Sequence, residues 1–307
     1  MQIAITGASG LIGSALIPAL RASGHEVLRL VRRPAESADE LSWDPAGEPL
    51  DPGGLSTVDA VVHLAGVGIA DKRWTEAHKR AVLDSRLQGT RTISAAIAAA
   101  RPRPRVLLSA SAVGWYGDTG DRIVDESAPA GEGFLADVVR QWEGATRAAA
   151  DAGTRVVLLR TGLVCVDGDG ILGRMMPLAR LGLLSPLGSG RQYQPWISLA
   201  DEVAAMQFLL DSDGVAGPVN LTGPVPVTNA ELTQTLLHVC GRRRLAPRVP
   251  AALLRLGLGA MADEAVLAGQ RAVPRVLEEA GYRFAHPTFE AAARWATGRS
   301  AGGVSPH

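Results

Sequence analysis

Three glycines near the start of the chain, Gly7, Gly10 and Gly13, follow the spacing G-x-x-G-x-x-G between a β-rich run and a helical run. In a strand–turn–helix unit the first such glycine permits a tight turn, the second lets the backbone approach a pyrophosphate, and the third lets helix and strand pack closely. The start of the helix, at Leu11 and Ile12, adds free N–H groups and the positive end of a dipole. The pattern predicts a phosphate-binding loop, and a purely structural turn is the alternative.

Two arginines, Arg32 and Arg33, follow Val31 at the end of the second predicted strand. Sites that bind NAD carry an acidic residue at this place, which holds the ribose 2′-hydroxyl. A guanidinium instead pairs with a 2′-phosphate through two hydrogen bonds, whereas a carboxylate repels it. We therefore expect NADP(H) to be the cofactor, with plain surface arginines as the alternative. Asp44, after a third strand, is expected either near the adenine or on the open surface.

The elements that must position these residues alternate between short β-rich runs and longer helical runs through the first half of the chain. Predicted strands cover residues 2–6, 26–31, 60–65, 105–109 and 155–160, and predicted helices cover residues 11–23, 75–100 and 134–152. Such alternation is typical of a parallel sheet with helices on both faces. The expected fold class is therefore α/β, a Rossmann-type doubly wound parallel sheet.

Beyond residue 165 this alternation weakens, and residues 229–297 look mostly helical. We predict an NADP(H)-binding domain over residues 1–165 and a smaller, mostly helical substrate lobe over residues 166–297, partly interleaved with the sheet. Residues 298–307 are rich in glycine and serine, so we expect them to form a flexible tail.

The composition of the chain restricts the partners it can have. Thirty-one basic side chains balance thirty-one acidic ones, which argues against nucleic acid or an anionic membrane as a partner. No apolar run reaches the roughly 18 residues of a membrane helix, and a strand that begins at Gln2 leaves no room for a signal peptide. Two cysteines give no disulfide framework of the secreted kind and fit a reducing compartment. We expect a cytoplasmic protein with a small-molecule substrate and no metal site; its oligomeric state stays open.

Longer motifs extend the pattern beyond a general dinucleotide fold. Asp59-Ala-Val-Val-His-Leu-Ala-Gly66 resembles the fourth strand of the extended short-chain dehydrogenases/reductases, the NAD(P)-dependent epimerase/dehydratase family. Further landmarks of that family follow in order along the chain, at Gly89-Thr90, Ser109–Gly117, Arg160–Val164, Gly188–Gly190 and Trp196–Asp201. The resemblance covers residues 1 to about 295 and implies the family's fold and an NAD(P) cofactor.

One atypical branch of this family, whose substrate is not generally established, is similar to the whole chain. The stretches that point to it are residues 70–74, 114–117, 170–173 and 269–274. The resemblance implies that Leu64, Ala65 and Gly66, after the fourth strand, line the NADP(H) site. It implies the same for Arg86 and for Val164, which follows the sixth strand. Ordinary members carry asparagine near Arg86; an arginine there is expected to neutralise the pyrophosphate, with a solvated helix charge as the alternative.

The usual acid–base pair of the family is absent. That pair is Tyr-x-x-x-Lys on the helix that here starts near Phe134. Its lysine lowers the tyrosine pKa from about 10, so that the phenol passes a proton at neutral pH. The chain has three tyrosines, and none is followed by lysine four residues later. When Glu143 is aligned with the family's glutamate, Leu135 and Val139 stand in the two catalytic positions.

Ser111 and Tyr116, in the family's serine segment, are the candidate catalytic residues. Ser111 is expected to hydrogen-bond a substrate oxygen, with a buried structural hydroxyl as the alternative, and Tyr116 to face the nicotinamide as a neutral proton donor. His63 is expected to be a packed histidine. The leading interpretation is an NADP(H)-dependent oxidoreductase with unusual acid–base residues. The alternative is a noncatalytic NADPH-binding sensor or scaffold that acts through a protein partner.

Overall fold

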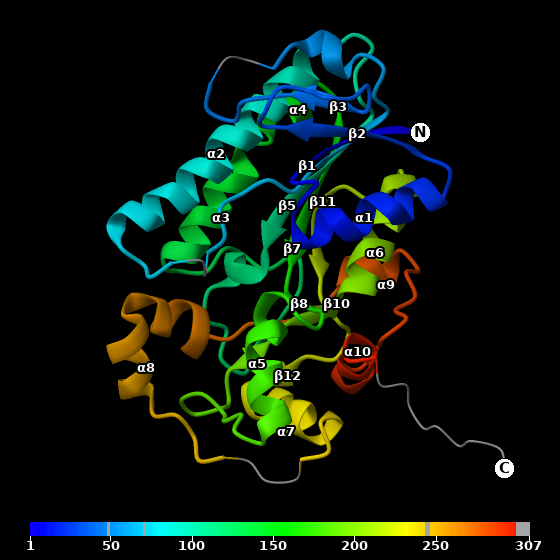
Figure 1. The fold of residues 1–307 in the computed structure, drawn as a ribbon. Coiled ribbons are helices and arrows are strands. Elements are labelled where there is room, and N and C mark those ends of the chain that lie inside the picture. The colour runs from blue at the N-terminus through cyan, green and yellow to red at the C-terminus, as the bar shows by residue number, and fades with distance from the viewer. Residues whose placement is uncertain (48–49, 70–71, 243–245, 299–307) are drawn as a thin grey trace, which may run out of the picture. The chain divides into compact units, whose positions relative to one another are not determined.

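A seven-stranded sheet lies at the centre of the fold in the computed structural model, which describes residues 1–47, 50–69, 72–242 and 246–298 (Figure 1). The strand order is β11-β7-β5-β4-β1-β2-β3. These strands are β1 Gln2–Thr6, β2 Glu26–Val31, β3 Glu40–Ser42, β4 Ala60–His63, β5 Val106–Ala112, β7 Arg155–Thr161 and β11 Gly217–Leu221. β1 pairs in parallel with β2 and β4, and the β2–β3 and β4–β5 pairs are parallel as well.

Helices cover both faces of this sheet. They are α1 Leu11–Ala22, α2 Glu76–Ala99, α3 Phe134–Gly144, α4 Arg147–Asp151 and α6 Leu199–Asp211. In Figure 1, α2 and α3 lie on one side of the strands, and α1 and α6 lie on the other. Gln207 of α6 donates a hydrogen bond to Ser23, directly after α1, at 3.0 Å. The predicted Rossmann-type doubly wound sheet is confirmed.

Several predicted bounds differ from those observed: the strand expected over 105–109, for example, is β5 Val106–Ala112. Local hydrogen bonds explain two further differences. The strand expected over 60–65 ends at His63, because the next two N–H groups donate to the Thr6 side chain and not to a neighbouring strand. The helix expected over 134–152 is divided into α3 and α4. Between them, the Thr146 hydroxyl donates to the Glu143 carbonyl oxygen at 2.7 Å, a side-chain bond that competes with the helical ladder.

The core of the sheet explains why its β-rich runs are strands. All four residues of β4 are buried, as expected for a central strand covered on both faces. Val61 of β4, Leu107 of β5, and Ile93 and Ile97 of α2 belong to one buried hydrophobic cluster. This cluster fixes α2 against the strands whose carboxyl ends carry the candidate site.

The chain forms two compact units, each built from three separate stretches. The first, called here the sheet unit, contains Met1–Trp115, Phe134–Arg160 and Val203–Val219. The second unit contains Tyr116–Gly133, Thr161–Glu202 and the described chain from Asn220 onward. Each unit has its own buried hydrophobic cluster.

The second unit is built from short strands and helices around its own core. Its strands are β6 Ile123–Val124, β8 Leu163–Cys165, β9 Tyr193–Gln194, β10 Trp196–Ser198, β12 Val227–Thr228 and β13 Arg271–Ala272. Its helices are α5 Gly170–Leu181, α7 Asn229–Val239, α8 Ala251–Leu258, α9 Arg275–Glu279 and α10 Phe289–Ala296. In the core, the Trp196 and Phe289 rings meet edge-on with their centres 5.5 Å apart. This contact joins β10 to α10.

Some expectations concern residues that the structure leaves undescribed. The tail expected over 298–307 lies outside the described residues except for Gly298, and so do residues 70–71 of the 70–74 stretch. Within the described ranges, no helix combines the length and the apolar composition needed to cross a membrane. The same part of the chain contains no group of three or more histidine, cysteine or acidic side chains that could hold a metal ion.

Candidate dinucleotide-binding site

The three glycines at the junction of β1 and α1 are required for different reasons. Gly7 adopts a φ of +69° and lies against the segment after β4, where a Cβ would come within 2.8 Å of the Leu64 carbonyl carbon. A Cβ on Gly13 would overlap the carbonyl oxygen of Gly7. Gly10 has an ordinary φ of −78°, and a Cβ there would meet only the Gly7 oxygen, at 3.3 Å. Protein atoms therefore account for Gly7 and Gly13, whereas the open side of Gly10 leaves room for a ligand.

The start of α1 presents backbone N–H groups toward this open side. The N-cap residue Gly10 has no side chain to accept a hydrogen bond, and the first turn contains no acidic residue. The N–H groups at a helix start, here those of Leu11 and Ile12, have no acceptor within the helix and carry partial positive charge. An anion is the ligand that such a helix end favours.

A buried threonine fixes the backbone that faces the glycine loop. The Thr6 hydroxyl oxygen accepts hydrogen bonds from the N–H groups of Leu64 and Ala65, at 3.0 and 3.2 Å. It also lies 2.7 Å from Nδ1 of His63. Because the two N–H groups occupy the oxygen lone pairs, the hydroxyl proton is donated to Nδ1. Thr6 therefore holds the residues after β4 in place beside Gly7.

His63 is a structural residue of this network. Its Nε2 lies 3.1 Å from the Thr90 hydroxyl, so a neutral ring accepts at Nδ1 and donates at Nε2. Thr90 also accepts a hydrogen bond from the Trp142 indole, at 3.0 Å. Burial lowers the pKa of His63 to about 4, which keeps the ring neutral at pH 7. The prediction of a packed histidine is confirmed.

Arg86, in α2, is a buried cation that pairs with no carboxylate among the residues that the structure describes. Its residue is 7% exposed, and its guanidinium donates to the carbonyl oxygens of Val67 and Val82 at 2.9 and 3.1 Å. It lies over the Trp142 ring, 4.8 Å from the centre. Among the described residues it forms no ion pair, and its buried Nε has no hydrogen-bond partner.

Arg86 lies close to the residues after β4. A Cβ on Gly66 would be 3.7 Å from a terminal nitrogen of the guanidinium. Burial lowers the pKa of Arg86 to about 10, so the side chain stays charged at neutral pH. Gly7 lies against Leu64 and Ala65, and the open side of Gly66 faces Arg86. The structure therefore brings together the glycine loop, the segment 64–66 and the arginine.

A pocket of about 470 Å³ lies beyond the carboxyl ends of β2 and β3. Its lining consists of Arg32, Arg33, Pro34, Leu41, Ser42, Trp43, Asp44, Leu50 and Asp51. The two arginines after Val31 and the aspartate after the third strand thus share one pocket. It combines apolar walls with cations, which suits the adenosine end of a dinucleotide.

Ser111, at the end of β5, is buried beside an ion pair. Its hydroxyl donates to Glu143 Oε1 at 2.6 Å. The same carboxylate accepts two hydrogen bonds from Arg160, at 2.8 and 3.0 Å, and the Arg160 guanidinium lies 4.1 Å from the centre of the Trp115 ring. The sequence analysis used Glu143 and Arg160 only as landmarks. The available signal was that Arg160 directly follows the apolar run of residues 156–159; the mixed polar surroundings of Glu143 gave no such signal.

Tyr116 belongs to the second unit and is 2% exposed. Its hydroxyl donates to Oδ1 of Asn220 at 2.7 Å. The amide nitrogen of Asn220 donates to the carbonyl oxygen of Val273 at 2.8 Å, which fixes Oδ1 as the acceptor. Val164, another predicted site residue of this unit, is half-buried in β8 and pairs with Ile197 of β10. Asn220 was not predicted from the sequence.

Leu135 and Val139, which the sequence analysis aligns with the family's acid–base pair, lie on the same face of α3. A Cβ on Gly114 would lie 3.5 Å from Leu135 Cβ and 3.7 Å from a methyl carbon of Val139. This face of α3 therefore packs against the turn after β5 through apolar contacts.

Comparisons with known proteins identify relatives along nearly the whole chain. The model of the NAD dependent epimerase/dehydratase family matches residues 3–222. A second model, described as a domain of unknown function, matches residues 249–296. The epimerase family protein Mb2239 of Mycobacterium bovis is 51% identical over 297 residues, which are 97% of this chain and 98% of that protein.

Solved structures agree with these matches. The crystal structure of human epimerase family protein SDR39U1 with NADPH is 34% identical, with a TM-score of 0.89, and the match covers 98% of this chain and 100% of the human one. A nucleoside-diphosphate sugar epimerase from Corynebacterium glutamicum is 32% identical, with a TM-score of 0.80, over 96% of this chain and 57% of that chain. The likeness thus extends over both compact units.

Proposed function

The chain belongs to the NAD-dependent epimerase/dehydratase family, and from this premise we propose that it is an NADP(H)-dependent oxidoreductase acting on a small molecule. The observation that carries the cofactor assignment is Arg86. A buried guanidinium without a carboxylate partner is costly unless an anion neutralises it. A pyrophosphate bound at Gly10 and the start of α1 would supply that anion beside the segment 64–66.

The remaining residues of the sheet unit fit the other parts of the same cofactor. In the pocket, the cation of Arg32 suits the 2′-phosphate of an adenosine. Trp43 offers an aromatic wall to the adenine ring, and Asp44 offers a hydrogen-bond acceptor to the adenine amino group. The human relative with NADPH supports the same choice. An acidic residue at the place of Arg32 would favour NADH instead.

Bound NADPH would supply a hydride, and the chain would supply the hydrogen bonds and the proton for the reacting oxygen. Ser111 and Tyr116 keep these roles in the proposal, because Ser111 lies at the carboxyl end of β5 and Tyr116 follows four residues after that strand, at the sheet edge where such folds bind ligands. Each hydroxyl now donates within the protein, Ser111 to Glu143 and Tyr116 to Asn220. Donation to a substrate requires that these internal bonds exchange for a bond to the substrate.

These same internal bonds favour a second candidate function, a noncatalytic NADPH-binding protein that acts through a protein partner. Both candidate hydroxyl groups are buried and satisfied within the protein. A protein that only senses NADPH needs the phosphate contacts but no proton donor. The two functions therefore share the cofactor site. They differ in whether Ser111 and Tyr116 exchange their hydrogen bonds to Glu143 and Asn220 for a bond to a substrate.

A screen of carbonyl compounds for NADPH oxidation tests the enzymatic proposal. We expect the parent protein to oxidise NADPH with at least one compound. Tyr116→Phe and Ser111→Ala are each expected to lower kcat about 100-fold or more, the usual contribution of a positioned proton donor, with the Kd for NADPH unchanged. Tyr193→Phe serves as the tyrosine control and should keep the parent rate.

Two results would contradict parts of this proposal. If both variants turn over at the parent rate, the assignment of the proton donor is wrong. If the parent binds NADPH tightly but oxidises it with no compound in the screen, the noncatalytic function takes precedence.

A further inference from the structure

The stretch 269–274, one of those that point to the atypical branch of the family, has no role in the proposed function. It lies within residues 249–296, which match a domain of unknown function. In the structure it runs beside the segment that begins at Tyr116, and β13 pairs in parallel with β6 of that segment. Both stretches belong to the second unit. Their contacts give the stretch a role.

The first two residues of this stretch hold the backbone that follows Tyr116. The carbonyl oxygen of Gly269 accepts a hydrogen bond from the Thr119 N–H group at 2.9 Å. The side-chain nitrogen of Gln270 donates to the carbonyl oxygen of Gly117 at 2.8 Å. Gly117 has a φ of +60°, so the chain turns sharply where Gln270 binds it. The turn directly after the tyrosine is therefore fixed by residues far away in the sequence.

The end of the stretch acts on Tyr116 through Asn220. The Val273 carbonyl oxygen accepts from the amide nitrogen of Asn220 at 2.8 Å, so the amide oxygen faces the phenol and accepts its proton at 2.7 Å. Asn220 is fully buried, and its backbone N–H group donates to Glu126 Oε1 at 2.9 Å. Its amide cannot turn the nitrogen toward the phenol without breaking the bond to Val273.

An acceptor at this place has the opposite effect from the lysine of the family's usual pair. An ammonium group stabilises the phenolate, whereas an amide oxygen that accepts the phenol proton stabilises the neutral form. A tyrosine held in this way keeps its proton at neutral pH and acts as an acid toward a developing oxyanion. A substrate oxyanion is a stronger acceptor than an amide oxygen, so it can replace Asn220 as the partner of Tyr116.

We propose that the stretch 269–273 is a positioning element for Tyr116, in which Gln270 holds the turn after the tyrosine and Val273 sets the amide of Asn220. Asn220 and Gln270 are then positioning residues that act through Tyr116 and keep its phenol a proton donor. The inference rests on the proposed function, because Tyr116 is the proton donor there. It also gives a role to part of the segment that matches a domain of unknown function.

Fluorine-19 NMR of protein labelled with 3-fluorotyrosine reports on Tyr116 without a substrate. The chain has three tyrosines, and Tyr116→Phe identifies the signal of Tyr116. We expect this signal to show ionisation only above the pH at which free 3-fluorotyrosine ionises. Asn220→Leu should lower the midpoint by about one pH unit, the equivalent of one lost hydrogen bond to the neutral form. Asn220→Asp keeps an acceptor oxygen, so its midpoint should be at least as high as in the parent.

Gln270→Leu tests the second positioning residue. It removes the donor to Gly117 and should lower the midpoint of Tyr116, because the phenol is no longer held against Asn220. In the double variant the midpoint should fall no further than in Asn220→Leu alone, because both residues act through one hydrogen bond. If Asn220→Leu does not fold, Gln270→Leu and Asn220→Asp still carry the test. The signal of Tyr282, whose hydroxyl donates to Asp201, is the internal reference.

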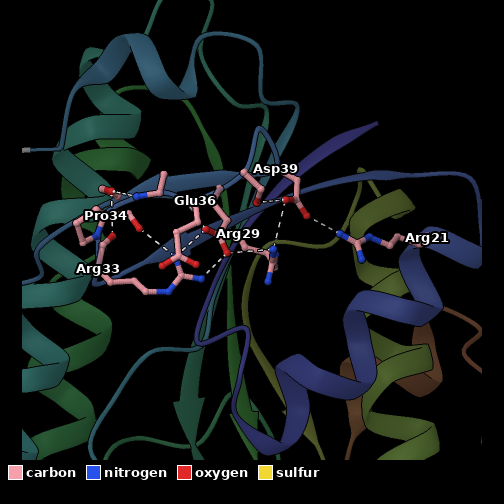
Figure 2. Close-up of polar contacts among 10 residues, drawn as sticks. Arg21, Arg29, Arg33, Pro34, Glu36 and Asp39 are labelled. Carbon is pink, nitrogen blue, oxygen red and sulfur yellow. Dashed lines mark hydrogen bonds and ion pairs between the residues drawn. The ribbon is translucent and has the colours of Figure 1, made fainter.

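Asp39→Asn is the control for the loss of polar contacts elsewhere. Asp39 lies in the sheet unit, whereas all three tyrosines lie in the second unit. Figure 2 shows its carboxylate between Arg21 and Arg29, at 2.9 and 3.3 Å. Glu40 continues this network to Arg33. Removal of the Asp39 charge should leave the midpoint of Tyr116 at the parental value.

Turnover provides a second test that a purely structural role would fail. With a compound found in the carbonyl screen, Asn220→Leu and Gln270→Leu should each lower kcat about tenfold or more, as expected when a proton donor is displaced. The Kd for NADPH should stay unchanged. In a Tyr116→Phe background neither substitution should lower kcat further, because the group through which both act is already absent.

Failure of this inference is distinguishable from failure of the proposed function. A parent protein that oxidises NADPH with no compound contradicts the enzymatic function, and the NMR experiment still decides whether Tyr116 is positioned. A parental midpoint in Asn220→Leu overturns the role of Asn220. A parental midpoint in Gln270→Leu, or a further fall in the double variant, overturns the role of Gln270. Further losses of kcat in the Tyr116→Phe background show that these residues do not act through the tyrosine.

Discussion

At the scale of single residues, two buried arginines of the sheet unit differ in their pairing with carboxylates. Among the described residues, Arg160 is 2% exposed and paired with Glu143, whereas Arg86 is 7% exposed and has no carboxylate partner. Removing one member of a buried ion pair typically costs about 3–5 kcal/mol, because the other charge stays behind unpaired. Removing a buried charge that had no partner leaves no charge behind. Equal substitutions should therefore have unequal effects.

We predict that Arg86→Met leaves the stability of the cofactor-free protein unchanged or raises it, while the Kd for NADPH rises at least about tenfold. Methionine keeps the apolar contact with Trp142 and removes the charge. Arg160→Met should instead destabilise the protein by about 3–5 kcal/mol. Urea unfolding and NADPH titration measure the two effects separately. A strongly destabilised Arg86→Met variant with parental NADPH affinity would make Arg86 a structural residue.

The sequence identified which residue types stand at the site but not which contacts they make. Arg32, Arg33 and Arg86 were found because guanidinium groups at those motif positions have a chemical meaning. The bonds of Arg33 to Glu40 and of Ser111 to Glu143 were not, because they depend on the register of β2 against β3 and on the rotation of α3. Neither quantity can be read from local spacing.

At the scale of elements, Gly10 and Gly13 belong to the same strand–loop–helix unit of β1 and α1, but a Cβ would meet different surroundings at each. A Cβ on Gly13 overlaps the loop backbone, whereas a Cβ on Gly10 meets only one atom, at 3.3 Å. We predict that Gly10→Val yields a folded protein that no longer binds NADPH, because its side chain fills the space for the pyrophosphate. Gly13→Val should lose stability, because α1 cannot then approach the loop.

Circular dichroism, thermal unfolding and NADPH titration of the two variants check this contrast. Retained NADPH affinity in a folded Gly10→Val protein would show that the loop is only a turn. A stable Gly13→Val protein would contradict the packing role of that glycine.

Whether a segment forms a helix or a strand could be predicted where its periodicity or motif context was strong. The residues at which each helix or strand ends could not. The end of β4 at His63 depends on Thr6, which is far away in the sequence but adjacent in the sheet. The break between α3 and α4 depends on one Thr146 side-chain bond. Leu135 and Val139, four residues apart, lie on one face of α3 because helical spacing is fixed.

At the scale of the whole molecule, two buried groups give the stability opposite dependences on pH. Burial raises the pKa of Glu202 from 4.5 to about 8, so its contribution to stability is complete below pH 4.5 and is lost as the pH rises toward 8. Burial lowers the pKa of His63 from 6.5 to about 4, so its contribution is present above pH 6.5 and is lost as the pH falls toward 4. Above pH 6.5 the Glu202 effect remains unopposed.

We therefore predict that the free energy of unfolding falls by about 2 kcal/mol between pH 6.5 and 8. Glu126, whose pKa burial also raises, adds a slope of the same sign. Glu202→Gln should remove most of the fall, since an amide oxygen can still accept the hydrogen bond of Thr161. Urea unfolding at half-unit pH steps measures the slope, with the exposed Glu26→Gln as control. An unchanged slope in Glu202→Gln would contradict this origin.

The order of the family motifs predicted the fold class. Contacts between stretches that are distant in the sequence could not be predicted from local patterns. Residues 116–133 follow β5 after a short turn, yet they belong to the second unit. There Ile123 pairs with Arg271 in parallel strands, and the Thr119 N–H group donates to the Gly269 carbonyl oxygen at 2.9 Å. The partners lie too far apart along the chain for periodicity to connect them, so the sequence alone could not place this stretch.

The hydrogen bonds around His63 also make the ring an internal spectroscopic probe. Thr6 donates its proton to Nδ1, so the ring proton stays on Nε2 and points to Thr90 in a site closed to solvent. Such a proton exchanges slowly with water, which makes it observable by nitrogen-15 NMR. The same Thr6 oxygen holds the N–H groups of Leu64 and Ala65. A ligand that polarises those amides therefore changes the chemical shift of a histidine that it never touches.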